Sequence, residues 1–185
     1  MEKETEKTIE GPCRTINIFG DITPSMAHDI LEQIFDIEIY DLVEEFPEPV
    51  IVNIYSLGGC AYSCQAIIDA LESLKATVVT RAYGSIQSAG FLIYLAGEYR
   101  LAGEHTTFMC HEISYGLDGN LKLHLQEIEE FKRMQKRMND LIKKKTKITD
   151  EELKSWSGTE KYFDYDEAVK YDIVNALFDL DEVYQ

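Results

Sequence analysis

Positive charge is scarce in this sequence. Its 185 residues include 18 lysines and arginines against 34 aspartates and glutamates, which gives a net charge of −16. Nucleic acids and anionic membrane surfaces would repel such a chain, so we expect neither as a partner. Long apolar runs are missing too: none reaches the roughly 18 residues of a membrane span, and residues 1–7 lack the apolar core of a signal peptide. We therefore expect a cytoplasmic protein.

Cysteine is also scarce, with four residues in the chain. Without a secretory signal they are expected to be reduced thiols. Cys60, Cys64 and the Cys110-His111 pair could in principle form a zinc site. The spacing of the first two lacks the usual two-residue gap, and Cys64 fits the apolar stripe of a helix. A metal site is therefore the weaker interpretation.

Two well-known motifs of α/β enzymes are absent. No G-x-G-x-x-G occurs, which argues against a Rossmann phosphate loop. The nucleophile elbow of α/β-hydrolases needs glycine two residues before its serine, but Ile86 precedes Ser88 at that position. No internal repeat or low-complexity segment is found either.

Apolar patterning predicts strands that alternate with helices. β-Branched or alternating runs predict strands at 14–19, 50–55, 76–82, 106–111 and 173–178. Helical spacing and cap residues predict helices that begin near residues 23, 61, 88, 121, 149 and 164, the one from 121 to 145 being the longest. This alternation favours an α/β domain with a largely parallel sheet and right-handed crossovers. We expect one domain over 14–185 after a flexible segment, 1–13.

The segment Tyr83–Phe91 lies between a predicted strand and a predicted helix. It holds two glycines and two serines, so a hydroxyl could lie beside backbone N–H groups at a helix N-terminus, where negative charge is stabilised. A structural turn with capping serines would explain the same residues. Gly58-Gly59 forms a second turn of this kind, and both fall at the edge of a parallel sheet where ligands usually bind.

Four motifs in order give the chain a family resemblance. Tyr55–Gly59 is similar to N-S-P-G-G, and Gly84–Gly90 to G-x-A-A-S-M-G. Phe108–His111 matches a strand that ends in a catalytic histidine, and Glu167–Val174 matches E-A-x-x-Y-G-L-I/V with Asp172 in place of glycine. From about residue 16 to 178 the chain thus resembles ClpP, the proteolytic subunit family of the Clp protease.

The resemblance implies a serine protease site. It places the nucleophile on Ser88 and the general base on His111. The family's third residue, an aspartate, lies seven positions before the E-A-x-x-Y motif, where this chain has Glu160; Asp164 and Asp166 are the nearby alternatives. A nucleophilic serine needs a base, and the base needs an acid that holds its tautomer.

The remaining implications concern the oxyanion hole and the assembly. By resemblance, the backbone N–H groups of Gly59 and Ala89 stabilise the oxyanion. The expected fold is the ClpP/crotonase-like α/β fold with a protruding handle helix, Leu121–Lys145. The expected assembly is a homo-oligomer, a tetradecamer of two heptameric rings. An AAA+ ATP-driven unfoldase would feed it polypeptide substrate, and no cofactor or metal is implied.

The predicted function is that of a serine endopeptidase which degrades unfolded polypeptides inside a closed oligomeric chamber. A catalytically silent ClpP-like ring subunit is the first alternative, because Gln87, Glu112 and Glu160 depart from the residues common in the family at these positions. An enzyme of the wider crotonase-like group, such as an acyl-CoA hydratase, is the second. That fold also holds oxyanions with backbone N–H pairs, and fold alone does not fix function.

Overall fold

A largely parallel sheet runs through the part of the chain that the computed structural model describes, residues 11–116 and 119–176. Its strand order is β1-β2-β3-β5-β6, with β4 also paired to β3. The strands are β1 (Thr15–Phe19), β2 (Val50–Ser56), β3 (Val78–Gln87), β4 (Tyr99–Ala102), β5 (Thr107–Cys110) and β6 (Lys161–Phe163). Five of these six described strands pair in parallel and β6 runs antiparallel to β5, so the predicted fold class is confirmed.

Six helices are present in the same described residues. They are α1 (Pro24–Asp41), α2 (Ala61–Ser73), α3 (Ala89–Leu95), α4 (Leu121–Lys145), α5 (Asp150–Ser155) and α6 (Tyr165–Lys170). The predicted caps hold three of them in place. The Thr23 hydroxyl accepts from Met26 N, and Thr149 forms a capping box with Glu152. Asp164 caps α6 by accepting from the Glu167 N–H.

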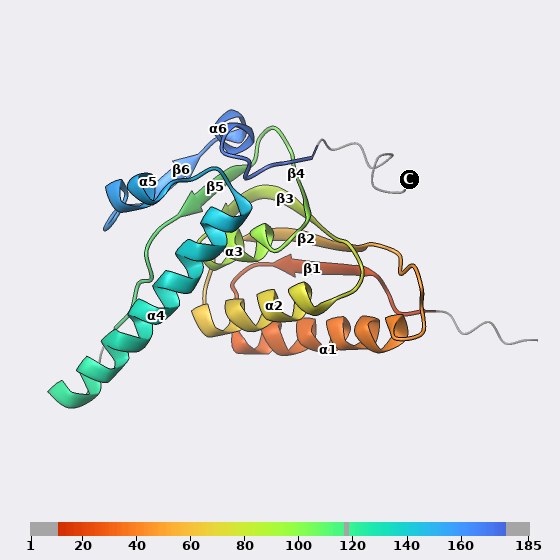
Figure 1. Ribbon diagram of the computed structural model, residues 1–185, viewed down its shortest axis with the longest axis horizontal. Coiled ribbons are helices and arrows are strands. Elements are labelled where there is room, and N and C mark those ends of the chain that lie inside the picture. Colours follow the sequence, from red (N-terminus) through yellow and green to blue (C-terminus); the bar gives the residue numbers. More distant parts are fainter. Residues whose placement is uncertain (1–10, 117–118, 177–185) are drawn as a thin grey trace, which may run out of the picture.

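Helices α1 and α2 lie side by side against one face of the sheet, as Figure 1 shows. Their buried faces meet inward-pointing strand residues in one apolar core that is rich in isoleucine. Only Met134 and Ile142 are buried along the 25 residues of α4. That helix runs obliquely away from the domain (Figure 1), so most of its surface has no core to cover.

Strand β3 pairs with two different strands, one after the other, along the same edge. Its first half, Val79–Ala82, pairs with β4, and its last residues, Ser85–Gln87, pair with β5. Between the two lies Gly84, whose φ of +62° is favourable for glycine, and the pairing with β2 shifts register nearby. The bend brings the end of β3 beside the end of β5.

The pattern analysis missed two short strands and misplaced another. Neither β4 nor β6 was predicted, because strands of three or four residues carry little periodicity. The predicted strand at 173–178 is wrong over 173–176, which form bends and irregular structure, and its last residues lie outside the described part. Most of the predicted flexible segment, 1–13, also lies outside it.

Candidate active site

Ser88 lies in the sharp turn between β3 and α3. Its φ of +51° and ψ of −120° fall in a region that non-glycine residues seldom adopt. Such a turn lifts the side chain out of both neighbouring elements, as at the strained serine of a strand–turn–helix nucleophile. The arrangement arises here without the G-x-S-x-G sequence.

Two glycines give this turn the room it needs. A Cβ added at Gly58 would lie 2.7 Å from Ser88 Cβ, and one added at Gly90 would lie 2.9 Å from Ser56 Cβ. Both distances are shorter than real carbon contacts. Gly58 also has a φ of +108°, which strains other residues. The turn after β2 and the start of α3 are thus packed backbone against backbone.

His111 directly follows β5 and meets Ser88. The Ser88 Oγ and His111 Nε2 atoms are 2.8 Å apart, within hydrogen-bond distance. The backbone supports this contact, since Ser88 N donates to Met109 O at 2.9 Å. When Nε2 carries no proton, the serine hydroxyl donates to it, which is the arrangement of a nucleophile and its base. The structure therefore brings together the first two predicted residues.

The predicted oxyanion donors line the same cavity as Ser88 and His111. Ala89 is the first residue of α3, where an N–H has no partner within the helix. Gly59 is held beside Ile22, whose N–H donates to Gly58 O and whose carbonyl accepts from Cys60 N. Among the described residues, neither the Gly59 nor the Ala89 N–H has a backbone partner, so both are available to a ligand.

The cavity has a volume of about 110 Å³. Its wall combines the site residues with side chains from α3 and α4, among them Leu92, Met138, Ile142 and Gln135. The apolar members favour an apolar group next to Ser88.

Glu160 lies near His111 in the strand pairing, but no hydrogen bond joins the two. The antiparallel pairing of β5 and β6 ends with Cys110 opposite Lys161, so His111 directly follows and Glu160 directly precedes the last paired residues. The Glu160 Oε2 atom instead accepts from the Tyr162 hydroxyl at 2.8 Å. Among the described residues, no hydrogen bond joins His111 to a carboxylate.

The two alternative acids have other positions. The Asp164 carboxylate accepts from Glu167 N at 2.8 Å as the cap of α6, and Asp166 is exposed in the first turn of that helix. The register makes Glu160 the best placed of the three, and its role stays a prediction. Its hydrogen bond raises the pKa of the Tyr162 phenol, because loss of the proton would set two negative charges together. Tyr162 follows Glu160 by two residues, a spacing that puts side chains on one face of a strand, and it was missed because β6 was not predicted.

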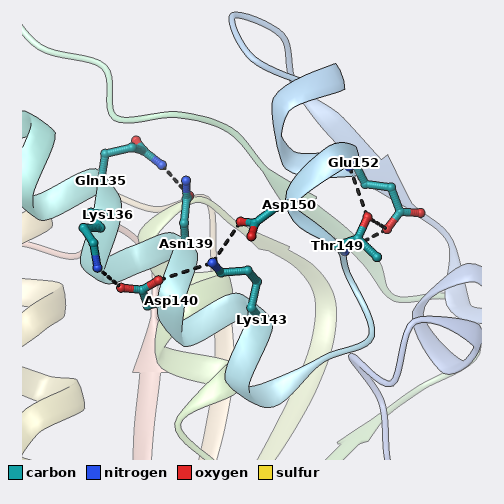
Figure 2. A network of polar contacts seen from close by, with 8 residues as sticks. All are labelled: Gln135, Lys136, Asn139, Asp140, Lys143, Thr149, Asp150 and Glu152. Atoms are coloured by element: carbon teal, nitrogen blue, oxygen red, sulfur yellow. Dashed lines mark hydrogen bonds and ion pairs between the residues drawn. The ribbon is translucent and has the colours of Figure 1, made fainter.

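The segment after His111 is tied to α4, which is itself joined to α5. Ile113 N donates to Gln135 Oε1 at 2.7 Å, and Gln135 Nε2 donates to Asn139. Figure 2 shows this pair on α4 close to the junction with α5, where Lys143 Nζ reaches Asp150 at 2.8 Å. Helix α4 therefore supports the site as well as extending from the domain, a role that its apolar pattern alone does not reveal.

Three cysteines lie around the site with different acidities. Burial raises the pKa of the Cys64 thiol to about 12 and that of Cys110, next to His111, to about 11. The pKa of Cys60 is lowered, mainly by the hydrogen bond from the Ser63 side chain and then by backbone N–H donors. No three His, Cys, Asp or Glu side chains of the described residues are grouped to hold a metal ion.

One aspartate also explains a departure from the family pattern. Asp172 stands where the motif has glycine, and its φ is +60°. Aspartate tolerates this left-handed conformation better than most residues, so the turn keeps its shape.

No helix in the described part of the chain is long and apolar enough to cross a membrane.

Comparison with known proteins gives one consistent family. The family model described as Clp protease matches residues 11–181. The chain is 28% identical over 169 residues to ATP-dependent Clp protease proteolytic subunit 2 of Pseudomonas aeruginosa, covering 89% of this chain and 80% of that protein. It is 26% identical over 166 residues to proteolytic subunit 3 of Rhodococcus jostii, with 89% and 80% covered.

A solved structure agrees with these sequence relatives. A point mutant of ClpP1 from Listeria monocytogenes matches with a TM-score of 0.77 and 27% identity. The match covers 93% of this chain and 95% of that one. Fold and sequence therefore give the same result over nearly the whole chain, and the resemblance drawn from the motifs is confirmed.

Proposed function

Because this chain belongs to the Clp protease family, we propose that it is a serine-type endopeptidase subunit which cleaves unfolded polypeptides. The observation that carries the proposal is the 2.8 Å contact between Ser88 Oγ and His111 Nε2 in a strained strand-to-helix turn. The family supports a peptidase, and this contact supports the serine mechanism. Ser88 is the nucleophile, His111 the base, and Glu160 the acid.

The chemistry follows acyl transfer. His111 Nε2 takes the Ser88 proton as Oγ forms a bond to the substrate carbonyl carbon, and the carbonyl electrons move onto oxygen. The Gly59 and Ala89 N–H groups stabilise that oxyanion, each worth on the order of 10²–10³ in kcat in comparable sites. His111 then gives its proton to the leaving amine, and water releases the acyl group by the same steps.

We further propose that the chain acts in a closed ring assembly. Leu121, Leu123 and Leu125 near the start of α4 are exposed, an arrangement that costs free energy in water unless another surface covers them. This supports the expected tetradecamer of two heptameric rings, joined through α4. A chamber of this kind needs an ATP-driven unfoldase to deliver polypeptide, and we propose a Clp-type ATPase as that partner.

A serine-reactive fluorophosphonate probe tests the enzyme proposal. Wild-type protein should be labelled, and Ser88→Ala should not. Cleavage of short apolar fluorogenic peptides should be lost in the same variant. The proposal fails if wild type reacts no more than Ser88→Ala does. Native mass measurement tests the rings separately, since a monomeric protein would contradict the assembly and leave the labelling result intact.

A silent ring subunit remains the second candidate, and one observation favours it. Glu160 accepts a hydrogen bond from Tyr162 while His111 has no carboxylate partner among the described residues. A dyad without an acid would hold the wrong histidine tautomer part of the time and react slowly. Equal, background-level labelling of wild type and Ser88→Ala in an intact ring would support this candidate.

A further inference from the structure

We propose that Glu112 is a positioning residue that fixes the turn carrying Glu160 relative to His111. This inference rests on the proposed serine protease function. Glu112 immediately follows His111 in the chain, and its carboxylate reaches across to the turn that precedes β6. Neither the family pattern nor the sequence periodicity assigns it a role.

Both oxygens of Glu112 bind that turn. The Ser157 hydroxyl donates to Oε1 at 2.9 Å, and the Gly158 N–H donates to Oε2 at 3.0 Å. Two bonds from one carboxylate to consecutive residues define an orientation as well as a distance. The carboxylate thus joins the backbone next to His111 to the backbone two residues before Glu160.

The other contacts on the acid side hold Trp156 and β6: Trp156 packs edge-on against Phe163, and Lys161 pairs with Glu167. The Glu112 bonds hold the turn between them. Strand β6 has three residues, and its pairing with β5 reaches no further than Lys161. Within the turn, Thr159 N donates to Trp156 O, and Gly158 has a φ of +73°, a conformation that favours glycine. These contacts shape the turn locally, whereas the Glu112 bonds set its position relative to the base.

The geometry predicts that the hydrogen bonds of the Glu112 side chain, and not its negative charge, maintain activity. In Glu112→Gln the amide oxygen can accept from Gly158 N, while the amide nitrogen donates to the Ser157 hydroxyl, which can turn to accept. Both contacts survive without the negative charge. In Glu112→Ala both are lost, and the turn is free to move away from His111.

The test compares peptide hydrolysis by wild type, Glu112→Gln and Glu112→Ala, with Glu104→Ala as control. Glu104 is an exposed carboxylate on the loop before β5 without a hydrogen bond among the described residues, so its removal changes net charge alone. We expect kcat to fall roughly tenfold in Glu112→Ala with KM nearly constant, the loss typical of one or two mispositioned hydrogen bonds. Glu112→Gln and the control should stay within about twofold of wild type.

A double-mutant cycle separates positioning from general destabilisation. If Glu112 acts through Glu160, then adding Glu112→Ala to Glu160→Gln should cost little further activity. Hydrogen exchange at the Gly158 amide should also speed up in Glu112→Ala and not in Glu112→Gln. Independent losses that multiply would overturn the proposal, as would equal losses in the Gln and Ala variants, which would indicate a charge effect on His111.

The two proposals fail in different ways. Wild-type protein that reacts with the fluorophosphonate but is unaffected by Glu112→Ala overturns the positioning role alone. Wild-type protein that reacts no better than Ser88→Ala overturns the enzyme proposal, and the positioning role falls with it.

Discussion

The two halves of the proposed active site are built very differently. The nucleophile half, Ser88 with Gly58 and Ala89, lies at the junction of β2, β3 and α3, where the backbones are in contact and the neighbouring side chains are buried. The acid half comprises Glu160, which directly precedes the three-residue strand β6, and Tyr162 within that strand, and it follows an exposed turn. Geometry in the first half is over-determined by packing, whereas in the second it depends on a few hydrogen bonds.

This difference predicts where the site is tolerant of change. A carboxylate one methylene longer than the family's aspartate can be accommodated at 160 because the side chain is exposed and free to adjust. A methyl group at Gly58 has no such freedom. The nucleophile half should therefore be sensitive to sterics, and the acid half to hydrogen-bond chemistry.

Gly58→Ala should have the largest effect. The added Cβ would meet Ser88 Cβ at 2.7 Å, in a backbone conformation unfavourable for alanine. We expect about 1–3 kcal/mol of lost stability and a loss of at least roughly 10²-fold in kcat/KM. Thermal unfolding and peptide hydrolysis measure the two. Gly20→Ala, where φ is +99° and an added Cβ meets nothing within 4 Å, controls for strain alone. Equal activity losses in the two variants would contradict the steric account.

Glu160→Gln should come next. The amide cannot stabilise an imidazolium at His111, so kcat should fall by roughly 10–100-fold, less than the 10⁴ known for a buried triad acid. Folding should hardly change because the side chain is exposed. Glu104→Gln, which alters an exposed carboxylate on the loop before β5, is the matched control. If kcat is the same in both variants, Glu160 is not the acid.

Two cysteines compare the partly exposed turn at Cys60 with the buried strand end at Cys110 through their pKa shifts. Alkylation requires the thiolate, so raising the pH from 7 to 9 should speed alkylation of Cys60, whose pKa is lowered, well before Cys110, whose pKa is about 11. At pH 8 we expect Cys60 to react at least about tenfold faster than Cys110. Mass spectrometry after iodoacetamide labelling of the folded protein gives both rates. Similar rates would indicate that the wall beside His111 opens to solvent.

Tyr162→Phe should have the smallest effect. Loss of the hydroxyl frees Glu160 Oε2, the atom that now accepts from Tyr162 at 2.8 Å. An exposed hydrogen bond has a small net free energy, so kcat should rise by no more than about fivefold. Steady-state peptide hydrolysis measures the change. A fall in kcat would instead mean that Tyr162 orients the carboxylate towards His111.

The motifs predicted more of the site than the periodicity did. Ser88 and His111 were identified from short sequence patterns around glycines and at a strand end, and the structure brings them into contact. The partners of Glu112 in the turn before β6 could not be predicted in this way. They depend on the pairing of β5 with β6, a three-residue strand whose sequence carries no clear alternation.

Local sequence was enough to define the α/β alternation, the helix caps and the extent of α4, and the short motifs of the family resemblance gave the candidate nucleophile and base. These features depend on local chemistry, such as apolar spacing, capping side chains and glycines where backbones approach. The strain in the turn at Ser88, the contact of Ser88 with His111, and the partners of Glu112 emerged from the three-dimensional fold alone. Such contacts join residues that are far apart in the chain, so they depend on strand register and packing, which no local pattern encodes.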